Sequence, residues 1–175
     1  MDDGRGASRR QTPSTNTGIT WGYGIPSGRK AIKWFKLLLL DEGDLPADIR
    51  NSPQIRHARD LLRQVGKTPT QAVADYLRFL WKHALVNIEQ VMTQSVVEGI
   101  PFRVVLTVPA IWNHIAIQRM RQAARDAGIL DPRLCGETTL HFVSEPEAAA
   151  LATFEDLKTR PNFKVRGSRQ IDVSQ

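Results

Sequence analysis

Apolar residues recur every three or four positions in the middle of the chain, which predicts a long amphipathic helix. The stripe consists of Val73, Leu77, Leu80, Ala84, Ile88 and Val91. The sequence "TPTQ" at 68–71 is a capping box: Thr68 caps the helix, Pro69 follows, and Gln71 reaches back. We expect this stripe to be core. Trp81 and His83 then need no special role, and no partner stands at metal-ligand spacing from His83.

A shorter helix is predicted upstream. It starts after Ser52 with Pro53 at its first position, and Gly66 ends it. Its buried face is expected to contain Ile55, Ala58, Leu62 and Val65. Before it, "ITWGYGIP" at 19–26 alternates bulky and small residues, as an extended segment or hairpin edge does. The stretch "KAIKWFKLLLLDEGDLP" at 30–46 is denser in apolar side chains and ends in an acidic turn.

The last third of the chain alternates strands and helices. "FRVVLTVP" at 102–109 is almost continuously apolar, which predicts a strand buried on both faces. A helix at about 114–127 follows, and Gly128 closes it in a left-handed cap. "TTLHFV" at 138–143 predicts a second strand, followed by a helix at 145–157. This order predicts an α/β fold with a parallel strand pair and a right-handed crossover.

Open α/β sheets bind ligands at the carboxyl ends of their strands. Two segments lie there, "TVPAIWN" at 107–113 and "SEPE" at 144–147. Local rules leave the second one open. Ser144 and Glu147 have the spacing of a capping box, or Glu145 is itself the cap ahead of a proline. A third alternative is that Glu145 does chemistry at the sheet edge.

The positions of the basic residues argue against a specific nucleic-acid partner, although the chain as a whole is basic. The formal net charge is +6, from 24 Lys and Arg against 18 Asp and Glu. Much of the excess lies in the two ends, at 1–18 and 158–175, which we expect to be unstructured tails. No basic stripe interleaved with aromatic residues occurs, nor a zinc spacing or an RNA-binding signature.

Cysteine content and hydropathy bear on the compartment. The chain has one cysteine, Cys135, which excludes an internal disulfide and fits a reducing compartment. Its fully apolar runs are short, such as "LLLL" at 37–40, so neither a membrane span nor a membrane partner is expected. The first residues contain no apolar core of a secretory signal. A cytoplasmic location is predicted, with the nucleus as the alternative.

Three ordered blocks carry a family resemblance: "VVLTVPAIWN", "QRMRQAARDAGIL" and "HFVSEPEAAALATFED". Together they resemble the ATPase domain of DnaK-type heat-shock chaperones, the heat shock protein 70 family of the actin-like ATPase superfamily. The variant is most similar to the divergent chaperone-like proteins frequent in fungi, and the resemblance covers about residues 21–157. It implies a partial actin-like ATPase (ribonuclease H-like) lobe at 19–157, with a helical insertion at about 52–98 and a core unit at about 101–157.

The resemblance also implies a chemistry, hydrolysis of the ATP γ-phosphate with Mg²⁺ between two lobes. Glu145 matches the acidic residue that works near the metal and its waters, so it would contact the metal through water. Lys36 matches the catalytic lysine that stabilises charge on the transferred phosphoryl group. Its alternative is a solvated lysine beside an apolar strand. Pro109 and Arg119 match the residues that relay the nucleotide state to another domain.

The departures from the family pattern limit what this chain does alone. The family's DxGTT-like turn does not precede Ile19, and no DxGGGT turn follows the second helix. Both phosphate-cradling turns are therefore missing, the other cofactor-binding residues are unknown, and no complete metal site is expected. The segment between Asn113 and Arg119 is about two residues longer than the family pattern.

Two functions remain from the sequence. The first is a fragment of a chaperone-like ATP-binding domain, truncated at both ends, that hydrolyses ATP negligibly by itself. As part of a longer chain it would serve client proteins and co-chaperones. The alternative is a non-enzymatic interaction module derived from such a lobe, which binds a partner through an exposed sheet edge.

Overall fold

The computed structural model describes residues 20–158 of the 175-residue chain. The chain divides into two units, residues 1–31 and 32–175. The described part of the first unit contains the 3-10 helix η1 (Gly22–Gly24), where Gly22 has a φ of +57°. The extended segment or hairpin edge predicted at 19–26 is therefore wrong, because residues 20–31 contain no strand and turn at a left-handed glycine. The predicted tails lie outside the described residues, except Lys158, which is helical.

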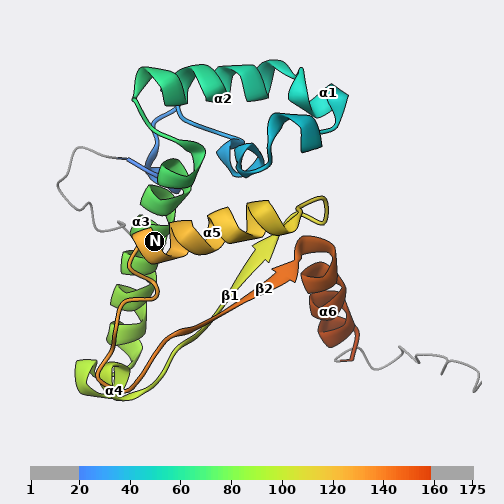
Figure 1. Cartoon of the computed structure of the whole chain (residues 1–175). Helices are drawn as coiled ribbons and strands as arrows, with labels where there is room; N and C mark the ends of the chain where they lie inside the picture. Colours follow the sequence, from blue (N-terminus) through green and yellow to red (C-terminus); the bar gives the residue numbers. More distant parts are fainter. Residues whose placement is uncertain (1–19, 159–175) are drawn as a thin grey trace, which may run out of the picture. The chain divides into compact units, whose positions relative to one another are not determined.

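The described part of the second unit combines helices with one two-stranded sheet (Figure 1). In chain order its elements are η2 (Phe35–Leu39), η3 (Glu42–Asp44), α1 (Ala47–Arg50), α2 (Pro53–Gln64), α3 (Pro69–Val91), α4 (Gln94–Gly99), β1 (Arg103–Val108), α5 (His114–Asp126), β2 (Thr139–Ser144) and α6 (Glu145–Lys158). None of the helices within residues 20–158 has the length and apolar character needed to cross a membrane.

Helices α2 and α3 begin where local signals predict, and α2 also ends where predicted. The Ser52 side chain accepts a hydrogen bond from the backbone N–H of Ile55 at 3.3 Å. The capping box of α3 is complete: Thr68 Oγ1 accepts from Gln71 N at 3.2 Å, and Gln71 Oε1 accepts from Thr68 N at 2.9 Å. Gly66 follows α2 with a φ of +63°, a backbone conformation that glycine adopts without strain.

The strands β1 and β2 are parallel, as predicted, with Val108 paired to Ser144 at their carboxyl ends. The prediction that β1 is buried on both faces is wrong. Its exposure alternates along the strand, so that Val108 is buried while Val105 is 51% exposed. Helices cover one face, on which β1 and β2 join a core with α3 and α5. The helix α6 follows β2 and contacts the sheet, but none of its residues is buried.

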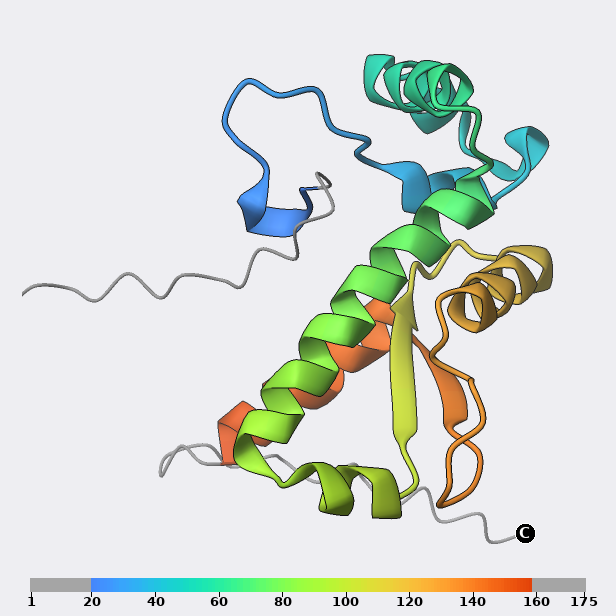
Figure 2. The same ribbon diagram turned by 90° about the vertical axis from the view of Figure 1, so that its left-hand side faces the viewer.

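The main core joins η2, the first half of α3, α5 and the covered face of the sheet. The prediction that the whole stripe of α3 is core is wrong in its second half. Val73 and Leu77 are buried, whereas Leu80 is 40% and Val91 86% exposed. Figure 2 shows α3 running along the sheet beyond the region where α5 packs on it. The buried residues of α3 therefore lie in its first half, in the core that it shares with η2 and α5.

A smaller core lies under α2. Leu38 packs there against Ile55, Ala58 and Leu62, three of the four residues predicted for the buried face of this helix. The fourth, Val65, is exposed, because α2 ends at Gln64 and the chain turns away at Gly66.

Candidate functional site at the carboxyl edge of the sheet

The two segments singled out in the sequence meet at one sheet edge. Because Val108 pairs with Ser144, the turn after β1 and the start of α6 leave the sheet together. Pro109 is the first residue after β1, and Glu145 is the first residue of α6. This edge is where open α/β sheets place their ligands.

Lys36 reaches this edge from a distant part of the sequence. Its Nζ lies 2.7 Å from Glu145 Oε1, across 109 positions of the chain. The same ammonium donates a hydrogen bond to the backbone carbonyl of Thr107, near the end of β1, at 2.9 Å. The side chains of Lys36 and Glu145 are 34% and 49% exposed, so solvent reaches the pair. An exposed ion pair of this kind contributes about 1 kcal/mol or less to stability.

The local fold of η2 explains how Lys36 comes there. The 3-10 helix starts after Trp34, whose φ of +62° is left-handed, and Leu38 and Leu39 anchor it in the core. Residues 35–39 form a 3-10 helix instead of the apolar strand that the alternative placed beside Lys36, and the catalytic role of Lys36 stays a prediction. A left-handed conformation costs a non-glycine residue roughly 1–3 kcal/mol, and the packing of the leucines offsets this cost.

The start of α6 separates the roles of its polar residues. The Ser144 hydroxyl accepts a hydrogen bond from the backbone N–H of Glu147 at 3.3 Å. Ser144 therefore caps the helix, and Glu145 lies inside it rather than ahead of it. The carboxylate of Glu145 is left to pair with Lys36. Its role in chemistry stays a prediction.

Trp112 belongs to this site and was missed in the sequence. The Lys36 Nζ lies 5.7 Å from the centroid of its buried ring, within the range of a cation–π contact. The backbone N–H of Trp112 donates to the carbonyl of Pro109 at 3.1 Å, which closes the turn after β1. The indole Nε1 is buried and has no hydrogen-bond partner among the described residues. A bulky aromatic residue in the turn "TVPAIWN" was the available signal.

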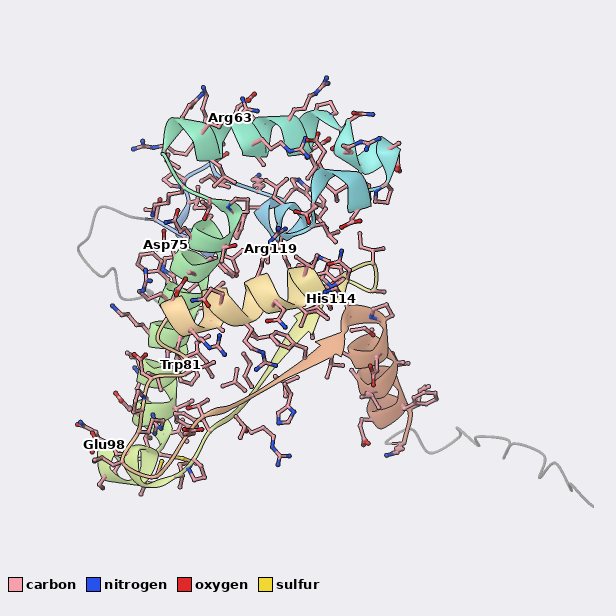
Figure 3. All side chains as sticks on the ribbon, in the orientation of Figure 1. Arg63, Asp75, Trp81, Glu98, His114 and Arg119 are labelled. Carbon is pink, nitrogen blue, oxygen red and sulfur yellow. The ribbon has the colours of Figure 1, made fainter. Side chains whose placement is uncertain are left out.

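Arg119 of α5 binds the C-terminal end of the segment that carries Lys36. One guanidinium nitrogen donates to the carbonyl of Leu39 at 2.8 Å and the other to Asp41 Oδ1 at 2.7 Å. Figure 3 shows Arg119 on the side of α5 that faces α2. Asn113 adds a bond from its Nδ2 to Asp44 Oδ2 at 2.7 Å. Residues 35–44 are thus held against α5.

Pro109 and Arg119, the two residues matched to a relay, make separate hydrogen bonds with different partners. Pro109 follows β1 and accepts a hydrogen bond from the backbone N–H of Trp112, whereas Arg119 donates to Leu39 and Asp41. The segment that looked about two residues longer than the family pattern is not a loop. Asn113 caps α5 by accepting from Ala116 N at 3.0 Å, and residues 114–126 are helical. The relay function of both residues stays a prediction.

Glu145 is the carboxylate of this site that could contact a metal ion. Within residues 20–158, no three His, Cys, Asp or Glu side chains gather as metal ligands. Mg²⁺ bound to a nucleotide takes one or two protein carboxylates and keeps several waters, because the phosphates supply the other ligands. Glu145 alone therefore fits a water-mediated contact to such an ion and does not make a metal site by itself.

The pair and the parallel sheet define the class of this molecule as a mixed helix and strand fold with a polar site at the carboxyl ends of its strands. Comparison with known proteins narrows this class. The chain is 34% identical to heat shock 70 kDa protein 12A of Homo sapiens over 119 residues, and 40% identical to heat shock 70 kDa protein 12B of Homo sapiens over 88 residues. These segments make up 67% and 49% of the chain. No protein-family model matches the chain, and no solved structure matches it.

The similarity relates the chain to the heat shock 70 kDa proteins over part of their length. The matched segments cover 16% of protein 12A and 12% of protein 12B, so the chain spans less than a fifth of these relatives. The fold is compatible with a partial actin-like lobe. The closer resemblance to DnaK-type and fungal forms, and the ribonuclease H-like topology, stay predictions.

Proposed function

We propose that the chain is part of a chaperone-like ATP-binding domain of the heat shock 70 family, with a partial actin-like, ribonuclease H-like lobe. In this proposal the Lys36–Glu145 pair lies beside the terminal phosphate of ATP and its Mg²⁺. The observation that carries the proposal is the 2.7 Å contact between Lys36 Nζ and Glu145 Oε1 at the carboxyl edge of the sheet. The two residues lie 109 positions apart in the sequence, so the contact is made by the fold and not by chain neighbourhood.

The pair suits phosphoryl chemistry. Bound Mg-ATP supplies the reactive phosphoanhydride, whose hydrolysis depends mostly on positioning and on stabilisation of charge. The Lys36 ammonium would stabilise negative charge on the transferred group. The Glu145 carboxylate would orient a water molecule or accept its proton. Thr107 and Trp112 hold the ammonium at the edge of the sheet, through the carbonyl bond and the ring contact.

One cation and one carboxylate do not bind a triphosphate tightly, because tight binding needs several fixed donors around the phosphates. We therefore expect the 175-residue chain by itself to bind Mg-ATP weakly and to hydrolyse it negligibly. An NMR titration with millimolar Mg-ATP tests the site. The expected shift changes centre on Lys36, Thr107 and Glu145, and both Lys36→Gln and Glu145→Gln abolish them.

A matched control is Lys82→Gln, which removes an exposed charge from α3 and should leave the titration unchanged. Shift changes that survive Lys36→Gln, or no changes at all with Mg-ATP, would contradict the proposed site. Micromolar binding in a calorimetric titration would contradict the weak affinity, since it would require a complete phosphate cradle in this chain.

A second candidate function is the non-enzymatic interaction module. It is favoured by the uncovered face of the sheet, where Val105 is about half exposed, and by the exposed Leu151 and Phe154 of α6. Large exposed apolar side chains in neighbouring elements are typical of interaction surfaces. Binding of a protein partner that is lost in Val105→Asp but kept in Lys36→Gln would support this function over the first.

Client proteins and co-chaperones are partners that this proposal implies only for a longer protein. The cytoplasmic location and the lack of a specific nucleic-acid or membrane partner are likewise predictions from the sequence.

A further inference from the structure

A cavity beside η2 is lined by neither Lys36 nor Glu145. Its volume is about 470 Å³, within the range of small-molecule sites. The lining comes from η2 and the acidic turn after it, from α2, from the start of α3, and from Arg119 of α5. Leu38, Leu40 and Leu62 give it an apolar floor, and all three are buried.

The residues that line this cavity include more basic than acidic side chains. Four basic residues line it, Arg59, Arg63, Lys67 and Arg119, against two acidic ones, Asp41 and Glu42. The two acidic residues are paired inside the lining, Asp41 with Arg119 and Glu42 with Arg59.

The remaining two cations have partners outside the cavity. Arg63 pairs with Asp60 and Lys67 with Asp75, and neither aspartate belongs to the lining. Both of these pairs are partly or largely exposed, with the Arg63 side chain 74% exposed. Exposed pairs of this kind are weak, so an anion in the cavity can recruit Arg63 and Lys67 at low cost. Arg63 and Lys67, once recruited, would supply two positive charges above the leucine floor.

We propose that this cavity binds a small phosphomonoester with an apolar body. A phosphate monoester carries a charge of about −1.5 to −2 at pH 7, which matches the two positive charges that Arg63 and Lys67 supply when they leave Asp60 and Asp75. Guanidinium groups pair well with the oxygens of phosphate, and the leucine floor takes the apolar body. The site lies apart from the proposed nucleotide site, because Lys36 and Glu145 do not line it.

Phenyl phosphate is the probe, because it joins a dianion to a compact apolar ring. We expect saturable 1:1 binding to the full chain by calorimetry. Arg63→Gln and Lys67→Gln should each weaken it about tenfold, the usual effect of losing one charge-assisted hydrogen bond. Inorganic phosphate, which lacks the ring, should bind more weakly than phenyl phosphate, and benzyl alcohol, which lacks the charge, should not bind.

Two matched variants identify the site. Arg125→Gln removes an exposed charge of α5 outside the cavity and should leave the affinity unchanged. Lys36→Gln should also leave it unchanged, even if it abolishes the effect of Mg-ATP, so the two proposals can fail separately. Binding lost in Lys36→Gln but kept in Arg63→Gln and Lys67→Gln would overturn the assignment. Absence of saturable binding, equal affinity for inorganic phosphate, or tighter binding of a phosphotyrosine peptide would overturn it as well.

Discussion

The two halves of α3 carry the same apolar periodicity and have opposite surroundings. In the first half, Val73 and Leu77 are buried against α5 and η2. In the second half, Leu80 is 40% and Val91 86% exposed, while Trp81 packs against the edge of the main core and against Phe102. The difference shows that a stripe predicts the face of a helix that can be buried, whereas the elements packed on that face decide whether it is.

The two halves also differ in their polar contacts. The first half starts at a complete capping box and carries Asp75 and Arg78, which link it to Lys67 before the helix and to the end of α5. The second half ends at Met92 in an extended conformation and passes into α4, whose start has no side-chain cap. Three comparisons between matched positions and one pH dependence test this asymmetry, from the largest expected effect to the smallest.

Truncating one leucine in each half should give the largest contrast. Leu77→Ala leaves a cavity in the main core and should lower the free energy of unfolding by about 3 kcal/mol. Leu80→Ala removes the same atoms one turn later, from a side chain that is 40% exposed, and should cost less than about 1 kcal/mol. Urea denaturation monitored by circular dichroism measures both. Equal losses would mean that the two halves do not differ in burial.

Removing the cap of α3 should have the next largest effect. Thr68→Ala leaves the backbone N–H of Gln71 without its acceptor and should cost about 1 kcal/mol. Thr93→Ala is the matched change at the start of α4, where the threonine side chain caps no backbone group. It should cost less than about 0.5 kcal/mol in the same denaturation experiment. A larger loss for Thr93 than for Thr68 would contradict the asymmetry.

A basic side chain in each half gives a smaller contrast. Arg78 donates to the carbonyl of Asp126 at 2.5 Å and to Asp75 Oδ1 at 2.7 Å. Arg78→Gln should therefore lower the free energy of unfolding, by about 1 kcal/mol or less because the side chain is partly exposed. Lys82→Gln removes an exposed charge from the second half and should change it by less than about 0.5 kcal/mol. Thermal unfolding of the two variants at one salt concentration compares them.

The smallest effect is a pH dependence from Asp75. Burial raises the pKa of this carboxyl, but hydrogen bonds and charge from Lys67 and Arg78 outweigh burial and leave it lower than the ordinary value of 3.8. The stabilisation from the ionised group is thus fully present above that value and is lost as the pH falls through the lower pKa of the folded state.

We expect wild type to lose its advantage over Asp75→Asn across that acidic range, by less than about 1 kcal/mol, and by less still at high salt. Denaturation curves at a series of pH values measure the difference. An advantage that grows on acidification would show that the pKa of Asp75 is raised in the folded protein.

Local signals were reliable wherever a boundary depends on neighbours in the sequence. Ser52, Thr68 and Gly66 mark helix ends by hydrogen bonds or backbone angles that span three or four residues. The alternation of strands and helices likewise predicted the parallel pairing, because adjacent parallel strands need a crossover between them. The prediction of burial was wrong: β1 is almost continuously apolar, yet Val105 is 51% exposed because helices cover only one face of the sheet.

For the candidate site, the sequence likewise predicted the residue types but not the contacts between them. Its residue types were visible in the sequence, with Glu145 after the second strand and Lys36 in "WFKLLLL". The contact between them was not, because it depends on how η2 packs on the core and on how Trp112 and Thr107 receive the ammonium. Arg119 was matched to a relay, but its bonds to η2 followed from the fold alone.

The sequence by itself determined where α2 and α3 start and where α2 ends, the alternation of strands and helices in the last third, and the polar residues at the carboxyl edge of the sheet. These features rest on hydrogen bonds and steric limits within a few residues. Tertiary structure alone decided which half of α3 is core, which face of the sheet is open, and that Lys36 meets Glu145. Each of these depends on groups far apart in the chain, whose positions follow from packing rather than from local pattern.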